Sequence, residues 1–156
     1  MSVVFRVEKT KYASSAAKGT GAFLFGARWN SPGHHVVYCG QHLSLAILEV
    51  LAHLTPATRK GKRVFFPITI DELAIHAVPR SKIPKPFLEG TDPMITQKIG
   101  DDWLDADEHP VLRVPSVIVP GEFNFLLNPD HPDYASAVKW GRPHPLELDG
   151  RIVVGP

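Results

Sequence analysis

The distribution of proline is the feature that most limits how this chain can fold. Thirteen of its 15 prolines fall from Pro67 onward, and none falls in the first 31 residues. Because proline fixes φ and lacks an N–H donor, it is disfavoured inside helices and in central strands. Proline suits corners between elements and the first turn of a helix, as at Asp92-Pro93. Pro115 and Pro120 stand at the two ends of a short apolar stretch. From Pro67 onward the sequence therefore predicts short elements joined by corners, in a compact β-rich fold.

The remaining pattern predicts short strands with two or three helices. The predicted strands are 3–7, 36–39, 63–70, 73–78, 111–114, 116–119, 123–127 and one or two within 146–153; the predicted helices are 44–54, 93–104 and 133–139. Residues 13–21 and 79–90 are predicted to be connectors, and Pro67 implies an edge or a bulge in its strand. Because strands and helices do not alternate regularly, we expect a single α+β domain over residues 1–156. Its core would be a curved or split β-sandwich of short, mostly antiparallel strands.

Composition excludes several classes of protein and site. The net charge is +1, which disfavours a nucleic-acid binder that depends on a strong positive field. The single cysteine excludes an intramolecular disulfide and a multi-cysteine zinc site, and no histidine pair has metal-ligand spacing. The first residues do not resemble a secretory signal, and no apolar run approaches the roughly 20 residues of a membrane helix. We therefore expect a cytoplasmic protein that needs no metal.

The helix predicted over residues 44–54 contains the first candidate functional residue. Apolar side chains cover almost its whole circumference, which is typical of a buried helix. Glu49 and His53 are its only ionisable residues and lie one turn apart. Because burial of a lone carboxylate costs several kcal/mol, Glu49 should either be paired with a core arginine or His53, or face a cleft as an active-site carboxylate. The helix alone does not distinguish these two possibilities.

Two arginines lie in apolar surroundings near the N-terminus. Arg6 is inside the first predicted strand, and Arg28 stands between Ala27 and Trp29. A guanidinium in such a place needs an anionic partner, so one arginine could neutralise Glu49. The second would then leave a cationic surplus that suits a phosphate or pyrophosphate. Tyr38 could stack on a flat ring or pack in the core.

Seven segments, in order along nearly the whole chain, carry a family resemblance. They are Phe5-Arg6, 26–30 (Gly-Ala-Arg-Trp-Asn), 36–38 (Val-Val-Tyr), 44–49 (Ser-Leu-Ala-Ile-Leu-Glu), 114–116 (Val-Pro-Ser), 124–132 and 148–151. Together they resemble the RES-domain family, the toxins of bacterial toxin–antitoxin pairs whose antitoxin is an Xre-like helix-turn-helix protein. The resemblance implies an ADP-ribosyltransferase-like fold with NAD as substrate. It also implies cleavage of the nicotinamide–ribose bond, with transfer of ADP-ribose to a protein acceptor, to water or to phosphate.

Carried over residue by residue, the resemblance implies one site. Its residues would be Arg6, Arg28, Tyr38, Glu49, Ser116 and Asn124. Glu49 would stabilise the positive charge that develops on the ribose, as carboxylates do in glycosidases. Arg6 or Arg28 would hold the pyrophosphate, Tyr38 would stack on nicotinamide, and Ser116 would bond the nicotinamide ribose or orient Glu49. Arginine-specific transferases carry Glu-x-Glu or Gln-x-Glu, whereas residues 47–49 read Ile-Leu-Glu, which disfavours an arginine acceptor.

The resemblance also implies partners, and two other functions stay open. An Xre-like antitoxin would cover the active site, and the protein could form a homodimer. The first alternative function is an endoribonuclease toxin that uses histidine and arginine as acid–base and phosphate-binding groups, which the 8 histidines permit. The second is a binding module without catalysis. In the endoribonuclease case Glu49 and the Arg28 turn would have no role.

Overall fold

One eight-stranded sheet organises the part of the chain that this computed structural model describes, residues 1–83 and 92–152. Its path is β4-β5-β6-β2-β1-β3-β7, and β8 pairs with β3 beside β7. The strands are β1 (Ser2–Lys9), β2 (Val37–Gly40), β3 (Arg63–Ile70), β4 (Ile75–Ala77), β5 (Val111–Pro115), β6 (Phe123–Leu127), β7 (Val138–Trp140) and β8 (His144–Leu146). The pairs are antiparallel except β4–β5, so the predicted α+β domain of mostly antiparallel strands is confirmed.

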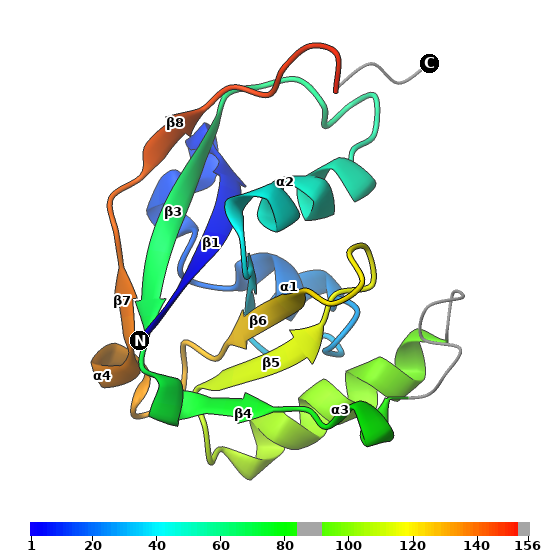
Figure 1. The fold of residues 1–156 in the computed structure, drawn as a ribbon, viewed down its shortest axis with the longest axis vertical. Helices are drawn as coiled ribbons and strands as arrows, with labels where there is room; N and C mark the ends of the chain where they lie inside the picture. Colours follow the sequence, from blue (N-terminus) through cyan, green and yellow to red (C-terminus); the bar gives the residue numbers. More distant parts are fainter. Residues whose placement is uncertain (84–91, 153–156) are drawn as a thin grey trace.

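The sheet is split between β1 and β2. These two strands are joined at a single register pair, Phe5 with Gly40, whereas β1 pairs with β3 along its whole length. Figure 1 shows the result: β4, β5 and β6 form one half of a curled sheet, and β1, β3, β7 and β8 form the other half. The predicted curved or split sheet is therefore observed, and the split lies next to the strand that contains Arg6.

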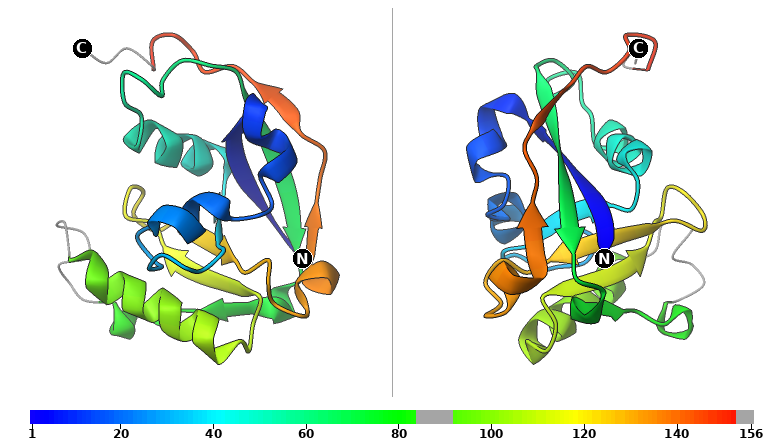
Figure 2. Two further views of the ribbon diagram at one scale, coloured as in Figure 1. Left: turned by 180° about the vertical axis from the view of Figure 1, so that it is seen from behind. Right: turned by 60° about the vertical axis from the view of Figure 1, so that its left-hand side comes forward.

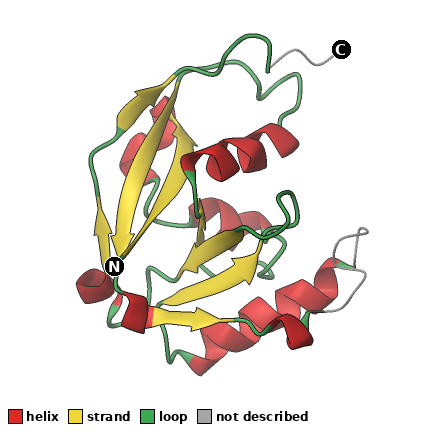
Figure 3. Cartoon of the chain, in the orientation of Figure 1, coloured by secondary structure: helices red, strands yellow, loops and turns green. Residues whose placement is uncertain are grey.

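Helices cover both halves of the sheet. They are α1 (Thr20–Phe25), α2 (Leu43–Ala52), α3 (Pro93–Ala106) and α4 (Tyr134–Ala137), with 3₁₀ turns η1 (Thr10–Ser15), η2 (Glu72–Ala74) and η3 (Arg80–Lys82). The helix α2 packs against β1 and β2, at the split. The longest helix, α3, begins at Pro93 under an Asp92 cap and connects the parallel strands β4 and β5 (Figure 3). Figure 2 shows η1 and α1 on the face of the sheet opposite α2. Within the described residues no helix combines the length and hydropathy of a membrane span.

Two apolar cores lie on the sheet. The first joins β1, β3 and their neighbours through fully buried residues such as Val4 and Ile68. The second lies between α3 and the β5–β6 pair and includes Trp29, Trp103 and Leu126. The second core therefore links the long helix to the turn that carries Arg28.

Pro67 lies at a break in the sheet, as its chemistry predicts. On the side away from β1, β3 pairs with β8 at residues 63–65 and with β7 at residues 68–70. Pro67 falls between these two ladders, where its carbonyl accepts one hydrogen bond from the Gly141 N–H at 2.7 Å. A Cβ at Gly141 would lie 2.7 Å from that carbonyl, so glycine permits the close approach.

Several predicted elements are wrong in position or type. Residues 116–119 form a turn rather than a strand, and residues 13–21 include parts of η1 and α1 rather than one loop. The predicted helix at 133–139 shortens to α4, because β7 begins at Val138 and pairs with β3. The last strand is β8 at 144–146 rather than within 146–153, and residue 153 lies outside the described residues, as do residues 84–90 of the predicted connector.

The helix α2 is less buried than its composition predicts. Leu45 and Ala46 are buried, but Leu48 is 41 % exposed. The reason is that α2 lies on one side of a split sheet instead of between two layers (Figure 1). Its apolar circumference therefore leaves an apolar stripe on the surface.

Candidate active site

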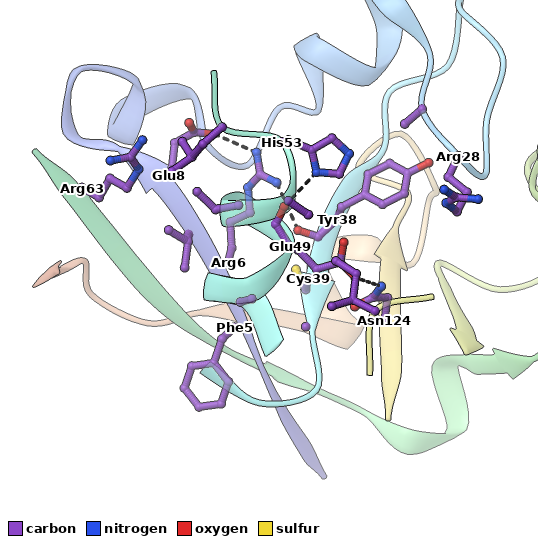
Figure 4. A pocket seen from close by; sticks show the side chains of 18 of the residues that line it. Phe5, Arg6, Glu8, Arg28, Tyr38, Cys39, Glu49, His53, Arg63 and Asn124 are labelled. Atoms are coloured by element: carbon purple, nitrogen blue, oxygen red, sulfur yellow. Dashed lines mark hydrogen bonds and ion pairs between the residues drawn. The ribbon is translucent and has the colours of Figure 1, made fainter. Parts of the chain in front are cut away.

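A cavity of about 610 Å³ lies at the split in the sheet. Its walls come from β1, the end of β2, the inner face of α2 and the turn at residues 27–29, with Asn124 of β6 at one side (Figure 4). Its volume is within the range of ligand-binding sites. The divergence of β1 from β2 creates this space, because side chains rather than a backbone ladder fill the gap between the two strands.

Glu49 faces this cavity from α2 and is held by an amide. The Asn124 Nδ2 donates to Glu49 Oε1 at 2.6 Å. Because a carboxylate accepts and does not donate, this contact fixes the amide orientation and leaves Asn124 Oδ1 free of partners; that oxygen is buried and unbonded. Glu49 forms no ion pair with any described residue. Among these residues no arginine neutralises it, and Arg6 pairs with Glu8 instead. The carboxylate is positioned while its charge remains uncompensated.

The Arg6 guanidinium is held by contacts within the protein. Its Nη2 lies 2.7 Å from Glu8 Oε2, and its Nη1 donates to the Tyr38 carbonyl at 3.1 Å. Tyr38 is in β2 at the position where β1 has turned away, so the guanidinium provides the bond that a strand neighbour would have provided. The Nε of Arg6 is buried and unbonded. Arg6 therefore joins the two strands and forms an ion pair with Glu8.

Tyr38 connects the cavity to the turn that follows α1. Its hydroxyl donates to Asn30 Oδ1 at 2.6 Å and accepts from the Trp29 N–H at 3.3 Å. Burial raises the pKa of the Tyr38 hydroxyl well above its ordinary value, so the group is a neutral donor at neutral pH. Asn30 is fully buried and also donates to the Ala22 and Ser31 carbonyls. The ring of Tyr38 lines the cavity with its hydroxyl fixed (Figure 4).

Arg28 is a cation of the site whose charge no described residue pairs. Its side chain is exposed, lines the cavity and makes no ion pair or hydrogen bond with the described residues (Figure 4). Its backbone is held firmly from α3: Thr96 Oγ1 donates to the Arg28 carbonyl at 2.5 Å, and Gln97 Nε2 donates to the Ala27 carbonyl at 3.0 Å. The side chain is thus free to bind an anion while its backbone is fixed.

Ser116 does not line the cavity. It is buried, and its Oγ accepts from the N–H groups of Ile118 and Val119 at 3.1 and 3.0 Å. The serine therefore shapes the turn at 116–119, from which Val117 and Ile118 reach the cavity wall. Its predicted contact with a ribose stays a prediction. Cys39 is buried, and burial raises the pKa of its thiol to about 12, so it is a packing group at neutral pH.

Sequence reasoning missed several residues that build the site. Glu8 could have been found, because residues two apart in a strand point to the same face and Arg6 needs an acid there. The Ser31 N–H and hydroxyl donate to the Asp101 carboxylate at 3.0 and 2.7 Å, and these bonds depend on where α3 lies in space. Arg63, 5 % exposed and bonded to the Thr58 carbonyl at 2.8 Å, closes the far end of the cavity and gave no local signal.

The cavity brings together charged, polar and aromatic groups that can contact a charged ligand. It offers a carboxylate without a cationic partner, an unpaired amide oxygen, an unpaired guanidinium and an aromatic ring on one cavity. Among the described residues, no group of three His, Cys, Asp or Glu side chains could hold a metal ion.

Comparisons with known proteins place the chain in a family. The family model described as RES domain matches residues 3–149. A protein named Toxin Res from Yersinia enterocolitica is 31 % identical over 150 residues, which cover 96 % of this chain and 99 % of that protein. A protein named Prs ADP-ribosylating toxin from Sphingobium sp. is 32 % identical over 145 residues, covering 91 % and 89 % of the two chains.

The fold is also found among solved structures. A chain of the Mycobacterium tuberculosis MbcT-MbcA toxin-antitoxin complex aligns with a TM-score of 0.73 and 16 % identity, covering 93 % of this chain and 84 % of that one. The split sheet is thus a known fold, and the matched residues include every element that lines the cavity. By the extent of that match and of the sequence identity, the chain belongs to the RES domain family.

Proposed function

We propose that this protein is the toxin of a toxin–antitoxin pair and that it consumes NAD by cleaving the nicotinamide–ribose bond. The observation that carries the proposal is Glu49, a carboxylate that faces the cavity and is fixed by the Asn124 amide instead of being neutralised by an arginine. Departure of nicotinamide leaves an oxocarbenium-like ribose, and a fixed negative charge lowers the energy of that state. An ion-paired glutamate would do so much less effectively.

The other residues of the cavity suit the rest of NAD. Arg28 binds the pyrophosphate through its planar fork, because its charge is not used by the protein. Tyr38 presents its ring to nicotinamide, and Asn124 Oδ1 accepts a hydrogen bond from a ribose hydroxyl or from the carboxamide. Arg6, whose charge is paired with Glu8, contributes by keeping β1 and β2 in position around the substrate. Nicotinamide leaves as a neutral molecule, so the bond breaks without a metal or a general acid.

The relatives support the proposed chemistry and an antitoxin partner. The Sphingobium relative is named an ADP-ribosylating toxin, and the fold neighbour was solved as a toxin-antitoxin complex. We propose that a helix-turn-helix antitoxin of the Xre type covers the cavity mouth. Exposed apolar side chains on α2, which lines the cavity, and just before the lining turn at 27–29 favour such a partner: Leu48 is 41 % and Phe25 82 % exposed. Homodimer formation and a cytoplasmic location stay predictions.

The test is direct measurement of NAD products. The purified protein is incubated with NAD, and nicotinamide, ADP-ribose, ADP-ribose phosphate and protein mass shifts are measured in parallel. Glu49→Gln should bind NAD with unchanged affinity yet lose about 100-fold or more of nicotinamide release, in the range found when one transition-state contact is removed. Glu147→Gln, at an exposed position outside the cavity, is the matched control and should retain full activity.

Two results would contradict the proposal. The first is equal nicotinamide release by the wild-type protein and Glu49→Gln. The second is cleavage of added RNA while NAD stays intact, which would favour the endoribonuclease alternative.

A further inference from the structure

The side chain of His53 lines the cavity but has no role in the chemistry proposed above. His53 directly follows α2, one helical turn after Glu49. His53 is the exposed residue that ends α2, and both its side chain and that of Glu49 line this one cavity. Figure 4 shows the His53 ring on the cavity wall, between the Arg6 guanidinium and the Tyr38 ring in this view.

One hydrogen bond sets the tautomer of this imidazole. His53 Nδ1 lies 2.8 Å from the Glu49 backbone carbonyl oxygen. Because a carbonyl oxygen can only accept, Nδ1 carries the hydrogen, and in the neutral ring Nε2 then presents a lone pair. Nε2 makes no hydrogen bond with any described residue. The ring is thus held by one nitrogen and leaves the other as a free acceptor, which is the arrangement of an oriented general base.

We propose that His53 is the general base for the acceptor in the NAD cleavage proposed above, on which this inference rests. As the bond from ribose C1′ to the nicotinamide nitrogen breaks, nicotinamide takes both electrons and leaves neutral. The acceptor oxygen forms the new bond to C1′, and its proton passes to His53 Nε2. Glu49 stays ionised throughout and stabilises the charge on the ribose.

This role specifies the chemical class of the acceptor. A water molecule or a protein hydroxyl must lose a proton on attack, so a base accelerates its reaction. A phosphate dianion attacks through an oxygen that is already deprotonated and gains little from a base. His53 therefore indicates a neutral O–H acceptor, and the site is built for transfer to water or to a hydroxyl side chain rather than to phosphate.

The decisive variant is His53→Asn, because it keeps the hydrogen-bond donor role of Nδ1 and removes the basic Nε2. The asparagine amide can still donate to the Glu49 carbonyl in place of Nδ1, but nothing replaces the Nε2 lone pair. NAD is cleaved in the presence of sodium azide, an anionic nucleophile that needs no base, and the ratio of azide adduct to free ADP-ribose is measured. We expect this ratio to rise about 10-fold or more in His53→Asn, since general-base catalysis typically contributes 10²–10⁴-fold. Unfolded molecules form neither product, so partial misfolding leaves the ratio unchanged.

Further arms of the experiment identify the acceptor and check specificity. His42→Asn, at the opposite end of α2 and outside the cavity lining, is the control and should leave the ratio at the wild-type value. Free ADP-ribose indicates water, and a mass shift on added protein indicates a hydroxyl side chain. An unchanged ratio in His53→Asn, or products formed only with inorganic phosphate, overturns the role of His53 while NAD cleavage stands. Absence of nicotinamide release by the wild type with every acceptor overturns both proposals.

Discussion

Gly100 offers a test of how the long helix supports the site. It is a buried residue inside α3, and a Cβ built there would lie 1.6 Å from the Trp29 carbonyl oxygen. Real Cβ atoms do not come closer than 3.0 Å, so Gly100→Ala must separate α3 from the Arg28 turn by about 1.4 Å. Because the obstructing atom belongs to the backbone, a side-chain rotation cannot relieve the contact.

The magnitude follows from the bonds that cross this contact. Thr96, Gln97 and Asp101 make four hydrogen bonds to the backbone and hydroxyl of the turn at residues 27–31. Loss of all four at about 1 kcal/mol each, less the roughly 1 kcal/mol that alanine gains over glycine in a helix, leaves a destabilisation of about 3 kcal/mol. A displacement of this size at a binding group can reduce turnover by about 100-fold.

Denaturant unfolding measures the loss of stability, and the rate of nicotinamide release from NAD measures the loss of turnover. Gly21→Ala is the matched control, because Gly21 is an exposed helical glycine whose added Cβ would meet nothing within 4 Å. If Gly100→Ala is too unstable to purify, Thr96→Val removes the bond to the Arg28 carbonyl without a clash and should cost about 1 kcal/mol. Gly100→Ala with the stability and the rate of nicotinamide release of Gly21→Ala would refute the proposed support by α3.

Three further predictions concern single side chains. Arg28→Lys should weaken NAD binding about 10-fold at unchanged melting temperature, because lysine cannot form a planar two-point contact; equal titration curves would exclude Arg28 as the phosphate anchor. Burial raises the pKa of the Cys39 thiol from 9.0 to about 12, so the unfolded chain releases this proton first and the free energy of unfolding should fall between pH 9 and 12. In urea titrations Cys39→Ala should show a shallower fall over this range, and equal slopes of unfolding free energy against pH would contradict this. His131 accepts from the Asp133 N–H and donates to the Asp107 carbonyl, so His131→Phe should lose about 2 kcal/mol in denaturant unfolding, and a loss below 0.5 kcal/mol would show that water replaces both bonds.

Local chemistry predicts those parts of the fold that neighbouring residues determine. The Asp92 cap and Pro93 locate the start of α3, because the cap bonds the Met94 N–H and proline tolerates the first turn. β3 occupies the predicted residues 63–70, since its alternation matches a half-buried strand. Residues 116–119 have the same β-branched composition, yet the Ser116 side chain bonds the next backbone N–H groups and closes a turn. Composition alone does not distinguish a strand from such a turn.

In the site, too, only the residues whose role depends on their sequence neighbours could be predicted. Glu49 is recognisable because an acid on an apolar helix needs an explanation, and the structure places it in the cavity with Asn124. The choice between Arg6 and Arg28 as the free cation could not be predicted, because it depends on Glu8 and on the gap between β1 and β2. Ser116 is present in the matching motif but does not line the cavity.

The parallel pairing of β4 with β5 has a consequence for the order in which the protein opens and closes. A parallel pair needs a crossover, and α3 is that crossover, so the helix that holds the Arg28 turn belongs to a unit with long loop closure. β4 pairs with β5 over residues 75–77, whereas β1 pairs with β3 along its full length, so fewer paired residues hold this unit closed. Hydrogen exchange should therefore show α3 and the Arg28 turn opening together while β1 and β3 stay protected. A molecule in that partly open state would retain its central strands and Glu49 on α2 but would have lost the cavity wall that Arg28 forms.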